Sequence, residues 1–305
     1  MSILKLVRPV NLLLIALSQI FVKFALFQPS ISASSLSTLG FVLLVIATLC
    51  IAAGGNIIND IYDVDIDRIN KPDKVLIGKM VGEKIANRWY IALTVLGVGI
   101  GFYLSNAIGR PGFAALFIVI SALLYVYASY LKGILIVGNL LVSGLVAMSL
   151  LIVGLFDLLP AITAENQSSQ LAIFKIVLAY ALFAFLLNLI REIVKDIQDI
   201  NGDKNGGLNT LPIAIGRKRT TTLVFILGVF TICCVVYYMY LHLYDSQLMV
   251  IYFLVLIVGP LLYFVTRAWS AINPKDFVLL SNLLKVIMFL GISSMWLYPL
   301  INIEH

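Results

Sequence analysis

The stretch Asn59-Asp60-Ile61-Tyr62-Asp63-Val64-Asp65-Ile66-Asp67 closes a long apolar segment that begins near residue 38. An ionisable side chain beside a membrane-spanning segment is costly unless it is paired, hydrated or coordinating a ligand. Several acids therefore stand where a plain membrane helix would carry none. The stretch marks both the end of a predicted transmembrane helix and a candidate functional site.

The spacing of these acids matters more than their number. Asp60, Asp63 and Asp67 are three and four residues apart, so on a helix they fall within about 60° of one another. Asn59 lies at the edge of that face. Asp65 points roughly the opposite way, toward solvent. The spacing predicts one helix with a face of three carboxylates.

A second window repeats the pattern. Asp196, Asp199 and Asp203 have the same spacing, and Glu192 takes the place that Asn56 takes in the first copy. The two copies are 136 residues apart, close to half of the chain. We therefore expect two related four-helix halves plus one further helix, arranged around a central cavity.

The carboxylates within each window repel one another, so a cation should neutralise them. All of the candidate ligands are oxygens, which favours Mg²⁺, with Mn²⁺ as the alternative. Each Mg²⁺ usually binds only one or two carboxylates and fills its other positions with phosphate oxygens and water. Six carboxylates therefore predict two or more ions that are shared with a diphosphate. The candidate metal ligands are Asn59, Asp60, Asp63, Asp67, Asp196, Asp199 and Asp203, and the candidate catalytic residues among them are Asp63, Asp67, Asp199 and Asp203.

The composition places these windows in a membrane protein. Of 305 residues, 61% are hydrophobic and only 12% are charged, which excludes an ordinary soluble domain. The apolar runs are long enough for transmembrane helices, so the fold class is all-α and polytopic. We expect a single domain over 1–305, with cytoplasmic helix ends and cap loops at 59–88 and 191–219. About nine spans are expected near 10–27, 38–58, 90–107, 112–129, 134–156, 169–190, 220–241, 247–266 and 276–301.

Basic residues concentrate at alternate ends of these spans, around Lys5 and Arg8, 68–88, Lys132, 195–219, and Arg267 and Lys275. Cytoplasmic loops carry such an excess. The N-terminus is therefore predicted in the cytoplasm, the C-terminus outside, and both acidic windows on the cytoplasmic side. The opposite loops are predicted to carry Arg110, Asp157, Glu165, His242 and Asp245. This topology also explains most of the net charge of +6, and no nucleic-acid partner is expected.

Several cations accompany the acids and suit an anionic ligand bridged by metal. The candidate diphosphate-binding residues are Arg68, Lys71, Lys74, Lys132 and Lys195. The positive-inside bias predicts Lys and Arg here in any case, so for each of them a purely topological role is the alternative. Pro72 and Gly78, and the glycines from 202 to 207, predict turns that cover the site.

The chain resembles the UbiA-type superfamily of intramembrane prenyltransferases. The resemblance rests on Asn59 through Asp67 as the first signature and Asp196 through Asp203 as the second. The segments 68–72 and 210–212 extend it. It implies that Mg²⁺ bridges the acids to a polyprenyl diphosphate, that the diphosphate departs to leave an allylic carbocation, and that an acceptor attacks this carbon.

The resemblance also implies a pocket for the acceptor, lined by polar groups at the same helix ends. The candidates are Asn11, Asn56, Tyr125, Tyr127, Asn139 and Glu192. Tyrosines at this depth also serve as interface anchors, which is the alternative for Tyr125 and Tyr127.

The acceptor itself is less well determined. Arg8-Pro9-x-Asn11 and Arg191-Glu192-x₂-Lys195-Asp196 most resemble the branch that makes digeranylgeranylglyceryl phosphate. This favours a geranylgeranyl donor and a geranylgeranylglyceryl phosphate acceptor in the bilayer. An aromatic acceptor of quinone biosynthesis, 4-hydroxybenzoate or dihydroxynaphthoate, is the alternative. The loop Lys74-Val75-Leu76-Ile77-Gly78 departs from the family's usual Arg-Pro-x-Pro-Ser-Gly.

A secondary transporter is the non-enzyme alternative, because carriers also place acids at corresponding positions of two repeats. Carrier acids are few and lie near the bilayer midplane. Here the acids gather at the ends of the apolar runs, which favours the enzyme. The sequence leaves the oligomeric state open.

Overall fold

The structure is a computed structural model that describes residues 2–31 and 33–300. This part of the chain contains nine helical segments long and apolar enough to cross a membrane, which confirms the expected number. They are Pro9–Ser30, Thr38–Tyr62, Glu83–Ala107, Pro111–Ser129, Val137–Ala161, Gln167–Asn205, Arg217–His242, Gln247–Trp269 and Pro274–Leu300.

Long α-helices make up most of these segments: α2 (Pro9–Phe21), α4 (Thr38–Tyr62), α6 (Glu83–Ala107), α7 (Ala114–Ser129), α8 (Val137–Val153), α9 (Gln167–Asn205), α11 (Arg217–His242), α13 (Gly259–Trp269) and α14 (Pro274–Ser293). Five helices are short: α1 (Ser2–Leu6), α3 (Gln28–Ser30), α5 (Val64–Asn70), α10 (Leu211–Ala214) and α12 (Gln247–Tyr252). The π-helical stretches Val22–Phe27, Gly154–Leu158 and Phe253–Val258 continue three of the spans. The 3₁₀ turns are Pro72–Lys74, Pro111–Phe113, Leu131–Gly133, Leu159–Ala161 and Ser294–Leu300.

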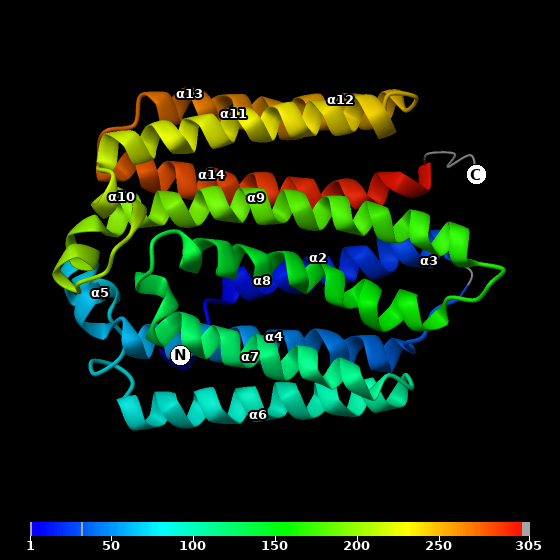
Figure 1. The fold of residues 1–305 in the computed structure, drawn as a ribbon, viewed down its shortest axis with the longest axis horizontal. Helices are drawn as coiled ribbons and strands as arrows, with labels where there is room; N and C mark the ends of the chain where they lie inside the picture. The colour runs from blue at the N-terminus through cyan, green and yellow to red at the C-terminus, as the bar shows by residue number, and fades with distance from the viewer. Residues whose placement is uncertain (1, 32, 301–305) are drawn as a thin grey trace.

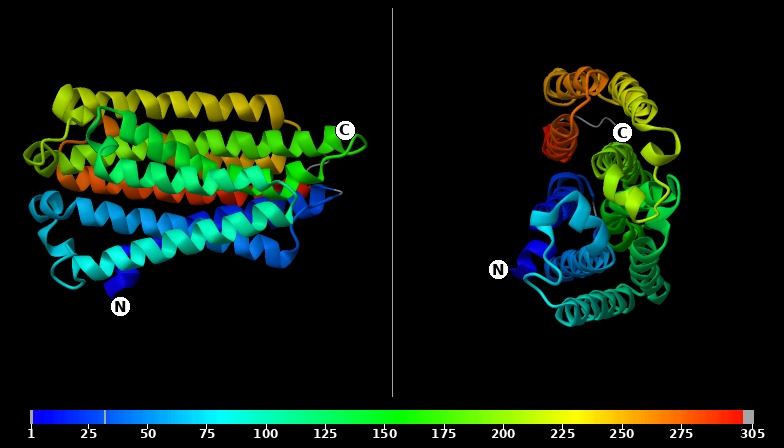
Figure 2. Two further views of the ribbon diagram at one scale, coloured as in Figure 1. Left: turned by 60° about the horizontal axis from the view of Figure 1, so that its bottom comes forward. Right: turned by 90° about the vertical axis from the view of Figure 1, so that its left-hand side faces the viewer.

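The helices run side by side along one direction (Figures 1 and 2). α4 packs along α6, both α8 and α14 pack along α9, and α11 packs along α13. Large apolar side chains such as Val95, Phe102 and Ile251 stay exposed on the outside of the bundle. Such a surface is stable in lipid rather than in water. The chain is an integral, multi-pass membrane protein.

A buried ion pair ties the span of α2 to the span of α8. Lys23 Nζ lies 2.6 Å from Asp157 Oδ2, and Asp157 is fully buried. Ser34 Oγ and the backbone N–H of Leu36 donate to its other oxygen at 2.5 and 2.9 Å. The prediction of a loop at Asp157 was therefore wrong: the residue lies in the π-helical stretch Gly154–Leu158, where a cation of an adjacent span compensates its charge.

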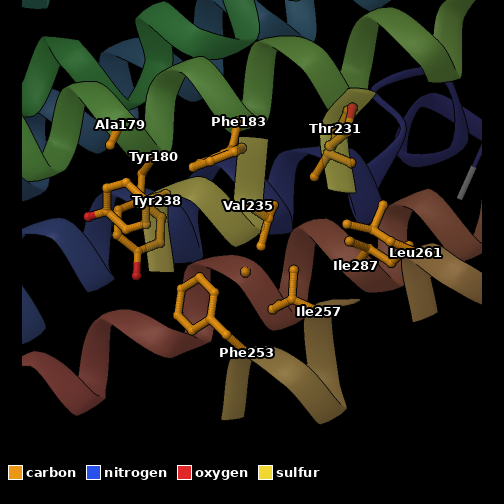
Figure 3. A pocket seen from close by; sticks show the side chains of 12 residues that line it. Ala179, Tyr180, Phe183, Thr231, Val235, Tyr238, Phe253, Ile257, Leu261 and Ile287 are labelled. Atoms are coloured by element: carbon orange, nitrogen blue, oxygen red, sulfur yellow. The ribbon is translucent and has the colours of Figure 1, made fainter. Parts of the chain in front are cut away.

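The α5 and α10 segments lie at one end of the bundle, on the left in Figure 1. Both acidic windows reach this end, since α5 follows α4 and α10 follows α9. A small apolar gap of about 40 Å³ lies elsewhere, between α9, α11, α13 and α14, where Phe183, Val235 and Ile257 face one another (Figure 3). It could hold little more than a few waters, and no candidate site residue lines it.

Candidate active site

The first acidic window spans a break between two helices. α4 ends at Tyr62, Asp63 has φ −88° and ψ 0°, and α5 begins at Val64. The expectation of one regular helix through Asp67 was therefore wrong. The backbone N–H of Asp63 still donates to Asn59 at 2.9 Å, and that of Asp67 to Asp63 at 2.8 Å. This i to i−4 bonding preserves the helical spacing of the acids across the break.

Each of the first two acids has its own partner. Arg8 Nη2 donates to Asp60 Oδ1 at 2.5 Å. Asp63 is buried, accepts from Asn59 Nδ2 at 2.6 Å, and forms an ion pair with Lys132. These contacts compensate two carboxylates that repel one another.

The remaining acids of this window differ in their surroundings. Burial, together with the charge of Asp63, raises the pKa of Asp67. Asp65 is 91% exposed and pairs with Arg68 at 3.0 Å, as the helical geometry predicts for the solvent side. Arg68 is thus exposed and pairs with the one acid of this window that is not a candidate metal ligand.

The second window lies in a continuous helix, α9. Asn139 Nδ2 donates to Asp196 Oδ2 at 2.8 Å, and Lys71 Nζ lies 2.6 Å from Asp199 Oδ2. Asp203 is only 3% exposed. The three acids of this window therefore share one face of α9, as their spacing predicts. Lys71 contacts Asp199 from the loop that follows the first window.

Lys132 brings the two windows together. It lies in the turn Leu131–Gly133, and it donates to Asp63. Burial alone would lower its pKa, but Asp63 foremost, with Asp203 and Asp67, raises it above the ordinary value. One ammonium group thus interacts with carboxylates of both windows.

Asn70 forms a second link between the windows. Its side chain donates to the carbonyl of Asp199 at 2.9 Å and accepts from the N–H of Gly202 at 2.7 Å. Both partners lie in α9, whereas Asn70 ends α5. The first window is therefore attached directly to the helix that carries the second.

Two residues with unusual backbone angles lie at this end. Arg8 has φ 54° and Ile136 has φ 57°, and each directly precedes a helix. Left-handed backbone is costly for residues other than glycine, above all for a β-branched one. Such strain is typical of functional sites, and one of the two strained residues, Arg8, is the partner of Asp60.

The candidate pocket residues divide between the inside and the outside of the bundle. Asn56 donates to the carbonyl of Val7 at 2.9 Å, and Tyr127 is half-buried. Tyr125, by contrast, is 42% exposed. Its ring lies against Tyr62 and Tyr90, and its hydroxyl accepts from that of Tyr62 at 3.1 Å.

A hollow of about 270 Å³ opens beside Arg8. It is lined by residues 8–11, Arg191, Lys195 and Lys285, so two candidates, Asn11 and Lys195, share it. Glu192 is buried next to it and pairs with Arg191 at 3.0 Å and Lys195 at 2.7 Å. The side chain of Lys74 lies outside the described residues.

Three residues at this end were not among the sequence candidates: Arg8, Asn70 and Lys285. Arg8 belongs to the motif Arg8-Pro9-x-Asn11 and Asn70 to the segment 68–72, but a motif alone does not say which partner each residue would contact. Lys285 had a clearer signal, because it is a single cation inside the last apolar run.

Comparison with known proteins agrees with this geometry. The model of the UbiA prenyltransferase family matches residues 20–299. The chain belongs to the UbiA prenyltransferase family. A digeranylgeranylglyceryl phosphate synthase from Korarchaeum cryptofilum is 34% identical over 251 residues, which cover 80% of each chain.

Solved structures share the fold of this UbiA family member. A UbiA homologue from Aeropyrum pernix K1 superposes with a TM-score of 0.69 and 15% identity, covering 95% of this chain and 98% of that one. A UbiA homologue from Archaeoglobus fulgidus, bound to GPP and Mg²⁺, has a TM-score of 0.61 and 19% identity, covering 96% and 100%.

Proposed function

We propose that this UbiA family member transfers a geranylgeranyl group from its diphosphate to geranylgeranylglyceryl phosphate. The observation that carries the proposal is the meeting of two acidic windows, from different helices, around Lys132 and Asn70. The name of the K. cryptofilum relative supports the glyceryl phosphate acceptor. The A. fulgidus homologue bound to GPP and Mg²⁺ supports a prenyl diphosphate donor and a divalent metal.

The residues present fit Mg²⁺. Their donors are all oxygens, and Asn59 Oδ1 and Asp199 Oδ1 are buried without a hydrogen-bond partner among the described residues. No three acids of the described chain already converge on one point, but each Mg²⁺ needs only one or two carboxylates besides phosphate oxygens and water. The metal ligands would be Asn59, Asp60, Asp63, Asp67, Asp196, Asp199 and Asp203, holding two or more ions, with Mn²⁺ as a substitute.

When bound, Mg²⁺ would neutralise the charge that develops on the departing diphosphate. Lys132 and Lys71 stand among the same acids and would bind the diphosphate oxygens directly. Asn70 would keep the two windows at a constant separation. The bond between C1 of the prenyl chain and oxygen breaks, with its electron pair leaving on the diphosphate. The acceptor hydroxyl oxygen then bonds to C1, and its proton would pass to the released diphosphate.

We place this chemistry at the cytoplasmic end of the spans, with the N-terminus on that side and the C-terminus outside. The support is the positive-inside bias, because Lys71, Lys132, Lys204 and Arg217 all lie at the acidic end of the bundle. The prenyl chains of both substrates would lie along the helices, in contact with lipid.

The test is product analysis with the purified protein. Radiolabelled geranylgeranyl diphosphate and Mg²⁺ are incubated with geranylgeranylglyceryl phosphate, 4-hydroxybenzoate or dihydroxynaphthoate in separate reactions. We expect label in a lipid product with the glyceryl phosphate. Label only in a prenylated aromatic would replace this acceptor with the quinone alternative. If no acceptor gives Mg²⁺-dependent release of diphosphate, the proposal that the protein is a prenyltransferase is refuted.

A further inference from the structure

Five cations gather where α11 and α14 begin and α13 ends, on the left in Figure 1. Three of them follow one another in the first turn of α11, one lies in the last turn of α13, and one lies in the first turn of α14. We call this set the basic patch: Arg217, Lys218, Arg219, Arg267 and Lys275.

Side-chain contacts hold these three helix ends together. The guanidinium of Arg217 lies 5.1 Å from the centre of the Phe277 ring, in the first turns of α14. The preceding residue, Asp276, has its Oδ1 3.5 Å from Nη2 of Arg267. Both α11 and α13 therefore contact the start of α14 through a basic side chain. The cations belong to one surface rather than to three separate helix ends.

The protein neutralises the basic patch poorly. Asp276 pairs with Arg267, and no ion pair joins the other four cations to any described residue. Five cations against one carboxylate leave a surplus of four positive charges. By contrast, the cations that contact a carboxylate around the acidic windows are Arg8, Arg68, Lys71, Lys132, Arg191 and Lys195.

The placement of the charges is also unfavourable for the isolated helix. The first turn of α11 contains three cations and no acid, although the helix dipole disfavours positive charge at this end. The positive-inside bias explains the sign of the charge on this side of the membrane. It does not require the charge to be concentrated in one helical turn. A bound anionic group would compensate both the dipole and the surplus charge.

We propose that the basic patch binds the headgroups of anionic phospholipids in the surrounding bilayer. Trp269 is 71% exposed and Ile272 is 74% exposed, and both lie between Arg267 and Lys275 in the chain. Exposed tryptophan at the end of a span is typical of the membrane–water interface. The neighbouring cations therefore lie at the depth of the headgroups, where lysine and arginine attract anionic lipid.

The apolar side chains beside the cations favour a lipid over a soluble anion. A phospholipid supplies a phosphate for the cations and acyl chains for the apolar neighbours. Trp269 also packs on Phe225 of α11, with ring centroids 4.9 Å apart. Lipid bound here would therefore contact the ends of α11, α13 and α14 together and stabilise their packing.

This binding is independent of the proposed reaction. None of the five cations is a candidate substrate-binding residue, and none lines the hollow beside Arg8. Its effect is expected on stability, because a ligand that binds only the folded chain raises the unfolding temperature. The test therefore needs neither donor nor acceptor, and failure of the transfer reaction would leave its outcome unchanged.

The experiment titrates the full chain, in neutral detergent and without Mg²⁺, with phosphatidylglycerol or with phosphatidylcholine of the same acyl chains. We expect the thermal unfolding temperature to rise with the anionic lipid and to change little with the zwitterionic one. Lys218→Gln/Arg219→Gln should need about tenfold more phosphatidylglycerol, or more, for half of the rise, because two cations near an anionic surface contribute at least this factor. Lys218→Arg/Arg219→Lys keeps both charges and should behave as wild type.

The matched control is Lys84→Gln/Arg88→Gln, which removes two exposed cations from the first turns of α6 and should leave the titration unchanged. In the wild-type protein, ionic strength of about 1 M, where the Debye length is about 3 Å, should reduce the rise. Inorganic phosphate alone should give none. An equal rise with phosphatidylcholine, with inorganic phosphate or at high salt would overturn the proposal. Equal titrations of the Lys218→Gln/Arg219→Gln and Lys84→Gln/Arg88→Gln proteins would overturn it as well.

Discussion

Asn70 Oδ1 accepts a hydrogen bond from the backbone N–H of Gly202 at 2.7 Å. This bond connects the end of α5 to the last turn of α9. It therefore joins the two acidic windows. Gly202 has no side chain, and a Cβ at this position would lie 2.4 Å from the Asn70 amide. The contact between the windows therefore requires glycine here.

The first prediction concerns this contact. Gly202→Ala should separate α5 from α9 and lower the transfer rate on the order of a hundredfold, because small misplacements of catalytic groups are costly. The measurement is the turnover of labelled geranylgeranyl diphosphate. Gly99→Ala adds the same methyl to α6, where a Cβ meets nothing within 4 Å, and should remain as active as wild type. Equal activity of the two variants would show that the contact is dispensable.

The second prediction concerns Lys132. Lys132→Met removes the ammonium that interacts with both windows, and the diphosphate loses a charged donor. We expect the KM of the donor to rise about tenfold to a hundredfold, the range of a hydrogen bond to a charged group. Lys84→Met, which removes an exposed cation from the first turn of α6, serves as the control. An unaltered donor KM in Lys132→Met would limit Lys132 to a structural role.

The third prediction separates stability from catalysis. Asp157→Asn leaves the charge of Lys23 uncompensated inside the bundle. Removing one partner of a buried pair typically costs about 3–5 kcal/mol, so the thermal unfolding temperature in detergent should fall clearly. Glu165→Gln changes an exposed carboxylate nearby and should have little effect. Because Asp157 lies away from the acidic windows, protein that remains folded should keep its specific activity. A selective loss of turnover without destabilisation would contradict this assignment.

Much of this architecture follows from the sequence, because lipid restricts the choices. The long apolar runs predict the spans, and the three and four residue spacing predicts which acids share a face. The prediction that Asp65 faces solvent is confirmed by its exposed pair with Arg68. Periodicity did not reveal the break at Asp63, since the i to i−4 bonds continue across it and the spacing looks unbroken.

Other features depend on contacts between distant segments. Lys285 looks like an isolated cation in the sequence, and only the packing of α14 beside α9 and α2 places it with Arg191 and Arg8. Asp157 looks like a loop acid until Lys23 is found 2.6 Å away. Tyr125 is exposed and packs against two other tyrosines. A helical wheel cannot predict this orientation, because all sides of its helix are apolar.

The central claim is that the two acidic windows form one site for the donor. The most direct measurement is Mg²⁺-dependent binding of labelled geranylgeranyl diphosphate to the purified protein and to three variants, Asp63→Asn, Asp199→Asn and Asp65→Asn. We predict that binding requires Mg²⁺, that chelation abolishes it reversibly, and that Asp63→Asn and Asp199→Asn each lose it while Asp65→Asn keeps it. Unchanged binding after substitution in either window, or an equal loss in Asp65→Asn, would contradict the account.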